Sequence, residues 1–456
     1  MWTVAQLRAD LDRGRTSSRE LVEQALARIA DAAGEGARAF LTVEADSARA
    51  EAEHCDRLRK RGVRRSPVDG LPVSLKDLFD VAGEITRAGS KLLAEAPAAQ
   101  RDAAAVARLR AAGAIFIGRT NMVEFAFGGV GLNPHYGTPR NPYDRPKGSA
   151  ALDPLSGRVP GGSSSGAAVS VADGMCVMGL GTDTRGSVRI PAGACGIVGF
   201  KPTARRVPRE GAFPLSFTLD SVGPLANSVA CCATYDAILA AEAPAMLPEL
   251  PVKGLRLLVP ASSPLAELDP EVEKAFQDAL RRLSAGGALI SELVVPAFDR
   301  QGEYFKGGGY AGAEAYYIHR AYLERIDEYD PRVGKRVILG KDISATEYLA
   351  LAELRAAYMR EIASAAAPFD AIVMPTLPCV APPIAAADAS DEDYFRCNLR
   401  LLRNCGLINF LDGCAVTLPC HVPGGAPVGF MVCGTEGSDR RILAVAAAIE
   451  RALAAN

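Results

Sequence analysis

Histidine and tryptophan are scarce in this chain, which has four histidines and one tryptophan among 456 residues. The histidines, at positions 54, 135, 319 and 421, lack the short paired spacing of metal ligands. We therefore expect no metal site and no cofactor. Histidine, the usual base for a serine nucleophile, is also a poor candidate here.

The chain lacks any marked excess of charge and any long apolar run. Its 51 Lys and Arg residues against 53 Asp and Glu residues give a net charge of -2. No basic patch predicts binding to nucleic acid, and no run of about 18 apolar residues predicts a membrane span. The N-terminal residues enter an amphipathic pattern directly rather than an apolar signal-peptide region. These features together predict a cytoplasmic protein.

The eleven cysteines do not resemble a disulfide framework. Their number is odd, their spacing is irregular, and no Cys-x-x-Cys pair occurs. Several lie in apolar surroundings, such as Cys176 and Cys433. We expect buried free thiols in a reducing compartment.

The hydrophobic pattern predicts an α/β fold. Apolar residues recur at helical spacing through the first sixty residues, and residues 114–118 read as a buried strand. A helix is expected after Asp269 as N-cap and Pro270 at its first position, and a helical pattern dominates residues 313–365. Without a repeat or an interdomain linker, we expect one domain over residues 1–456, with a central sheet between helices.

Three segments are candidates for chemistry. Lys76 follows an apolar strand, residues 160–166 form a Gly/Ser-rich loop, and residues 181–189 form a second loop ending in Ser187-Val188-Arg189. Each segment alone is most simply a turn. Because one helix and one strand separate the two loops, however, they can face each other across a single site.

The residue types in these segments suit nucleophilic catalysis. A serine hydroxyl needs a base to become a nucleophile, and lysine can serve if desolvation leaves it neutral. Apolar residues around Lys76, such as Leu75 and Phe79, would supply that desolvation. Glycines beside the serines allow backbone N–H groups to point at a developing oxyanion.

Residues 70–77, 160–166 and 181–191 together resemble the amidase signature family, as do residues 120–126, 199–203 and 219–224. The resemblance covers most of the chain, is closest over residues 70–225, and is looser over residues 226–456. It implies a single large domain whose central, mostly parallel mixed sheet is covered by helices on both faces.

The resemblance also assigns roles by position. It implies Ser187 as nucleophile, Ser163 as a bridging serine after a non-proline cis peptide, and Lys76 as base. Oxyanion-hole N–H groups are expected at Thr184, Arg185 and Gly186. A second group of residues is expected to support the loop or to contact the substrate: Asp183, Arg189 and Ser164 for the loop, and Arg185, Ala126 and Phe127 for the substrate.

The activity implied is hydrolysis of a small-molecule amide through an acyl-enzyme, with release of ammonia or an amine. Two alternatives stay open within the family. One is the glutaminase component of a glutamyl-tRNA amidotransferase complex, its A subunit, which makes ammonia from glutamine. The other is a ureide hydrolase of the carboxybiuret or allophanate kind. A small amide is the expected partner, and a homodimer is left open.

Two further interpretations compete with that of an amidase. Residues 162–166 also satisfy Gly-x-Ser-x-Gly, the nucleophile elbow of α/β-hydrolases, with Ser164 as nucleophile and His421 as base. An elbow requires a buried strand directly before it, and residues 155–160 do not suit one. A catalytically inactive binding protein is the other reading, but all three catalytic positions are occupied.

Arg185 departs from the commonest family pattern, which has glycine at this position. One interpretation turns its side chain outward, to pair with a nearby carboxylate. The other places the guanidinium in the substrate pocket, where it binds a carboxylate or a polarised carbonyl.

Overall fold

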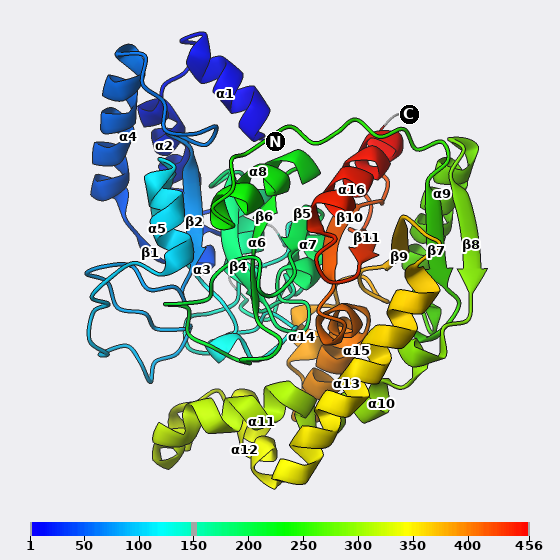
Figure 1. Cartoon of the computed structure of the whole chain (residues 1–456). Coiled ribbons are helices and arrows are strands. Elements are labelled where there is room, and N and C mark those ends of the chain that lie inside the picture. The colour runs from blue at the N-terminus through cyan, green and yellow to red at the C-terminus, as the bar shows by residue number, and fades with distance from the viewer. Residues whose placement is uncertain (1, 147–152, 455–456) are drawn as a thin grey trace.

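A computed structural model describes residues 2–146 and 153–454 and contains one 11-stranded sheet. From one edge to the other, the strands run β1 (Phe40–Val43), β3 (Ile115–Thr120), β2 (Pro72–Lys76), β4 (Met178–Asp183), β6 (Ser221–Ala226), β5 (Val198–Lys201), β10 (Cys414–Pro419), β11 (Gly429–Gly434), β9 (Ala371–Pro375), β7 (Arg256–Pro260) and β8 (Leu289–Leu293). The sheet thus joins the first and last thirds of the chain (Figure 1).

Parallel pairing occurs in two blocks of this mixed sheet, β3-β2-β4 and β9-β7-β8. The strands between the blocks, and the pair β1-β3 at the edge, are antiparallel. The mostly parallel pairing implied by the resemblance is therefore confined to the two blocks. One reason is the short connection between β10 and β11, which permits only a hairpin.

Helices cover both faces of the sheet, as predicted. Alternate side chains of β11 enter different cores, Phe430 and Val432 on one face and Met431 and Cys433 on the other. One face carries α5 (Ala104–Ala111), α8 (Val229–Leu239), α9 (Pro270–Ala285) and α16 (Asp439–Ala454). The other carries α2 (Ser18–Ala30), α4 (Ala45–Lys60), α6 (Ser165–Ala172), α7 (Arg189–Cys195) and α15 (Asp391–Phe410).

The predicted helix after Asp269 is α9, and Pro270 is its first residue. The helical pattern over 313–365 is instead divided among α11 (Gly309–Ile318), α12 (Pro331–Leu339) and α13 (Ala345–Ala366), with short 3₁₀ turns between them. Pro331 begins α12, where its missing N–H needs no partner. These helices gather at one end of the molecule (Figure 1).

All eleven cysteines are free thiols, and most are buried, as expected from their apolar surroundings. Across residues 2–146 and 153–454, the structure contains no helix with the length and apolarity needed to cross a membrane.

The close packing of α6 at Gly166 can be tested by adding a methyl group there. A Cβ atom at Gly166 would lie 2.3 Å from the carbonyl oxygen of Ala39 and 2.7 Å from the amide nitrogen of Asn121. Both neighbours are backbone, so Gly166→Ala should lower the free energy of unfolding by about 1–3 kcal/mol. Differential scanning calorimetry should show a Tm several degrees lower.

Gly302→Ala is the matched control, because no heavy atom lies within 4 Å of a Cβ atom at this helical position. Its Tm should be unchanged or slightly higher. Equal melting temperatures for the two variants would contradict the close packing of α6.

Candidate active site

Lys76 lies at the carboxyl end of β2 and is fully buried. Its Nζ atom is 2.8 Å from Ser163 Oγ and donates to Thr182 Oγ1 at 2.9 Å. Within the described ranges it forms no ion pair with a carboxylate. The pairing of β2 with β4 explains the contact with Thr182, because parallel strands bring their carboxyl ends to the same edge.

Burial lowers the pKa of Lys76 from its ordinary 10.5 to about 7. The negative charges of Asp220 and Asp183 oppose this change and keep the pKa from falling further. A substantial fraction of Lys76 is therefore an uncharged amine near neutral pH, with a lone pair that can accept a proton.

Ser163 lies in the loop before α6, and the Gly162–Ser163 peptide is cis. Its Oγ atom faces Lys76, and its backbone carbonyl accepts from the Val123 N–H at 3.1 Å. Ser163 and Lys76, 87 residues apart in the sequence, are thus brought together as the motifs implied.

Ser187 lies in the loop between β4 and α7 and is 4% exposed. Its carbonyl accepts from the Ser164 N–H at 3.3 Å, which ties this loop directly to the loop of Ser163. Helices α6 and α7 pack against each other behind the two loops. The predicted facing of the loops is confirmed.

Asp183 and Arg189 form a fully buried ion pair beside the nucleophile loop. The carboxylate accepts from Arg189 Nε and Nη2, each at 3.0 Å, and from Asn409 Nδ2 at 2.8 Å. Burial acts to raise the pKa of Asp183, but the charges of Arg189 and Lys201 and the hydrogen bonds from Arg189 and Asn409 together outweigh it and hold the pKa below its ordinary value. Asp183 therefore stays charged and anchors the loop.

Of the three backbone N–H groups expected to bind an oxyanion, those of Thr184, Arg185 and Gly186, one has another partner in the structure. The Gly186 N–H donates to Asp183 Oδ1 at 2.7 Å, so it supports the loop and is not available to an oxyanion. In contrast, the backbone N–H groups of Thr184, Arg185 and Ser187 find no acceptor among the described residues. These three groups, with Ser187 in place of Gly186, are the donors that the structure leaves for an oxyanion.

A narrow cavity opens at Ser187, with about 10 Å³ of space for water-sized molecules. Its wall includes Ala126 and Phe127, as predicted, and also Thr184, Arg185 and Arg336. This space is about what one water molecule needs, so the residues of the wall lie close together in this structure.

Among the described residues, Arg185 pairs with no carboxylate, which counts against the outward interpretation of its side chain. Its Cζ atom lies 3.7 Å from the centroid of the Phe305 ring, and its buried Nε has no hydrogen-bond partner among the described residues. The side chain belongs to the wall of the cavity.

The α/β-hydrolase reading is not supported. Residue 158 forms only an isolated bridge, so no strand precedes the serine loop. Ser164 Oγ donates to the Thr182 carbonyl, whereas His421 Nδ1 accepts from the Val428 N–H in the β10–β11 loop. Ser164 instead supports the loop, as the resemblance implied, through its N–H bond to Ser187.

Sequence reasoning missed Thr182, Asn409, Phe305 and Arg336 at this site. Thr182 lies within the segment 181–191 and next to Asp183, so its position at the end of a strand was a usable signal. The other three come from the C-terminal half, where no motif marked them.

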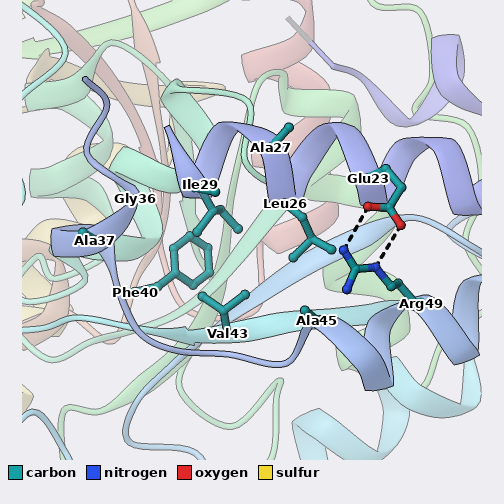
Figure 2. A pocket seen from close by; sticks show the side chains of 11 residues that line it. Glu23, Leu26, Ala27, Ile29, Gly36, Ala37, Phe40, Val43, Ala45 and Arg49 are labelled. Carbon is teal, nitrogen blue, oxygen red and sulfur yellow. Dashed lines mark hydrogen bonds and ion pairs between the residues drawn. The ribbon is translucent and has the colours of Figure 1, made fainter. Parts of the chain in front are cut away.

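A larger hollow lies between α2 and β1, where Leu26, Phe40 and Val43 form an apolar wall (Figure 2). Its charged side chains, Glu23 and Arg49, are bonded to each other. Across the described residues, no group of three or more His, Cys, Asp or Glu side chains could hold a metal ion.

Comparison with known proteins places this geometry in a family. The chain is 37% identical to 2-amino-5-chloromuconic acid deaminase of Comamonas testosteroni, with 90% of this chain and 88% of the relative covered. It is 34% identical to the A subunit of the glutamyl-tRNA(Gln) amidotransferase of Roseiflexus sp. (strain RS-1), with 98% and 96% covered. A crystal structure of an amidase superposes with a TM-score of 0.85 at 34% identity, over 99% of both chains.

The family model described as Amidase matches residues 20–443, a span that includes Lys76, both serine loops and Asn409. The chain therefore belongs to the amidase family of amide-hydrolysing enzymes.

Proposed function

We propose that this enzyme hydrolyses a small-molecule amide through an acyl-enzyme on Ser187. The observation that carries the proposal is the buried, carboxylate-free Lys76, whose Nζ lies 2.8 Å from Ser163 Oγ. An uncharged lysine can act as a base. The neighbouring Ser163 belongs to a loop that is hydrogen-bonded to the loop of Ser187.

In the first half-reaction, Ser187 Oγ attacks the amide carbonyl carbon. Its proton passes to Ser163 Oγ as the Ser163 proton passes to Lys76 Nζ. The carbonyl oxygen becomes an oxyanion, which the N–H groups of Thr184, Arg185 and Ser187 stabilise. The C–N bond then breaks, and the leaving nitrogen takes a proton back through the same relay.

In the second half-reaction, water attacks the ester on Ser187 and gives its proton to the relay. The tetrahedral intermediate collapses to a carboxylic acid, and Ser187 regains its proton. Ammonia or an amine and one carboxylate are the products.

The comparisons support two substrate classes. The deaminase relative is named for a small organic acid, and the amidotransferase relative for a reaction on tRNA. We take the first class, a small amide, as the substrate of this chain, and the ureide alternative is also a small molecule. A comparison of glutamine with an analogue that lacks its ammonium group would test the glutaminase alternative.

The relay predicts the behaviour of three variants. Ser187→Ala and Lys76→Met should each lower kcat by about ten-thousandfold or more, whereas Ser163→Ala should retain some activity because water can replace its hydroxyl. Since the residues act as a unit, the losses should not add in a double variant. Ammonia release from a panel of amides measures the rates.

Ser170→Ala serves as the matched control, because this buried serine of α6 bonds to Ser74 and lies outside the relay. It should keep wild-type activity, and circular dichroism should show that all variants are folded. An active Lys76→Met enzyme at neutral pH would refute the relay. A fluorophosphonate should label Ser187 and not Ser164, as read by mass spectrometry of the peptides.

The lowered pKa of Lys76 predicts the pH dependence. Only the uncharged amine accepts a proton, so kcat/KM should rise about tenfold per pH unit below the pKa of about 7 and level off above it. Initial rates from about pH 5 to pH 9 would test this, with circular dichroism over the same range as a folding control. A rate that falls as pH rises through 7 would contradict a neutral Lys76 as base.

A further inference from the structure

Two arginines without counter-ions line the cavity at Ser187. Arg185 comes from the nucleophile loop and Arg336 from α12, more than 140 residues later in the chain. Within the part of the chain that the structure describes, neither forms an ion pair with an acidic side chain. None of the described residues in the cavity wall is acidic.

Both guanidinium groups are held by aromatic rings instead of carboxylates. The Arg185 Cζ atom lies 3.7 Å from the Phe305 ring centroid, and the Arg336 Cζ atom lies 4.0 Å from that of Phe127. Arg336 Nη1 also donates to the Phe127 carbonyl at 2.6 Å. These contacts position the side chains but leave their positive charges without compensation, because a ring face offsets only part of the charge.

The acidic side chains of Asp220 and Glu314 accept hydrogen bonds from groups other than the two arginines. Asp220 accepts from Thr184 Oγ1 and from the Leu215 N–H, and Glu314 accepts from the Thr218 N–H. Both arginines are half-buried, and a cation partly withdrawn from water without a counter-ion lowers stability, so an anionic ligand would be a favourable partner. Burial, together with the charge of Arg336, lowers the pKa of Arg185, in agreement with this lack of a partner.

We infer that Arg185 and Arg336 form a carboxylate-binding subsite, and that the substrate is a small amide bearing a carboxylate away from the reacting carbonyl. The inference rests on the proposed function and adds the substrate class to it. A planar guanidinium binds a carboxylate through two N–H groups, and the Nη groups of Arg185, which lines the cavity, form no hydrogen bond with the described residues. The same two charges disfavour a substrate that carries an ammonium group.

The test compares amides that differ only in charge. Succinamate and glutaramate carry a terminal carboxylate, butyramide and valeramide are neutral counterparts, and glutamine is glutaramate with an added ammonium. For the wild type, kcat/KM should be about ten- to a hundredfold higher for the charged amide of each pair. It should also be higher for glutaramate than for glutamine.

In Arg185→Gln and Arg336→Gln, the ratio of kcat/KM for the charged amide over its neutral counterpart should fall about ten- to a hundredfold. Arg320→Gln is the matched control. Like Arg336, Arg320 stacks on an aromatic ring and donates to a backbone carbonyl, both of Tyr317, but it is exposed and lies outside the cavity wall. Its ratio should equal that of the wild type.

Binding provides a readout that does not depend on turnover. Calorimetric titration of the Ser187→Ala variant with succinate and glutarate should show binding that weakens about tenfold or more when Arg185→Gln or Arg336→Gln is added. Turnover of amides without a preference for charge, and without dicarboxylate binding, would overturn the subsite and leave the proposed function standing. Arginine-dependent dicarboxylate binding without turnover of any amide would refute the proposed function and support the subsite.

Discussion

The buried ion pair of Asp183 and Arg189 is the interaction on which the active site depends. It joins the end of β4 to the start of α7, and Asn409 adds α15 by bonding to both partners. The carboxylate also accepts from the N–H groups of Gly186 and Val188, so it determines the course of the chain on both sides of Ser187. Removing one partner of such a pair typically costs about 3–5 kcal/mol, because the other charge stays buried.

Three cationic side chains of the site differ in how their positive charge is compensated. The charge of Arg189 is compensated by Asp183, which lies against it. Lys76 has no carboxylate in contact among the described residues, and burial lowers its pKa to about 7, whereas a guanidinium keeps its proton. Arg185 has no counter-ion among the described residues either and stays charged at neutral pH, and the proposed ligand carboxylate would compensate its charge. In the proposed mechanism, Lys76 is the base, Arg189 anchors the loop and Arg185 contacts the ligand.

Much of this could be predicted from the sequence, because local signals were strong where the chemistry lies. The buried positions of α9, Val272 and Phe276 among them, followed from helical periodicity. Lys76, Ser163 and Ser187 followed from their motifs, and the structure brings their loops together. Strand β6 was not predicted, since Ser221-Val222-Gly223-Pro224 has neither alternation nor the usual residues of a central strand.

The unpredicted parts of the site share a physical cause. Asn409 and Arg336 reach the nucleophile loop across more than 140 residues of sequence, and nothing local distinguishes them from other side chains of amphipathic helices. The helical pattern over 313–365 likewise gave no sign that Pro331 would begin a separate helix, α12, and direct Arg336 to the cavity. Long-range packing, not local preference, decides these positions.

Charge balance links the base to the cavity. Asp220 and Asp183 already raise the pKa of Lys76 against the effect of burial, so a further anion nearby would act in the same direction. A substrate carboxylate entering without a counter-ion would therefore return Lys76 toward its protonated, inactive form. Two arginines in the cavity wall neutralise such a carboxylate where it binds, which leaves the amine uncharged. The arginines that would select an anionic substrate are thus also what would make its presence compatible with a lysine base.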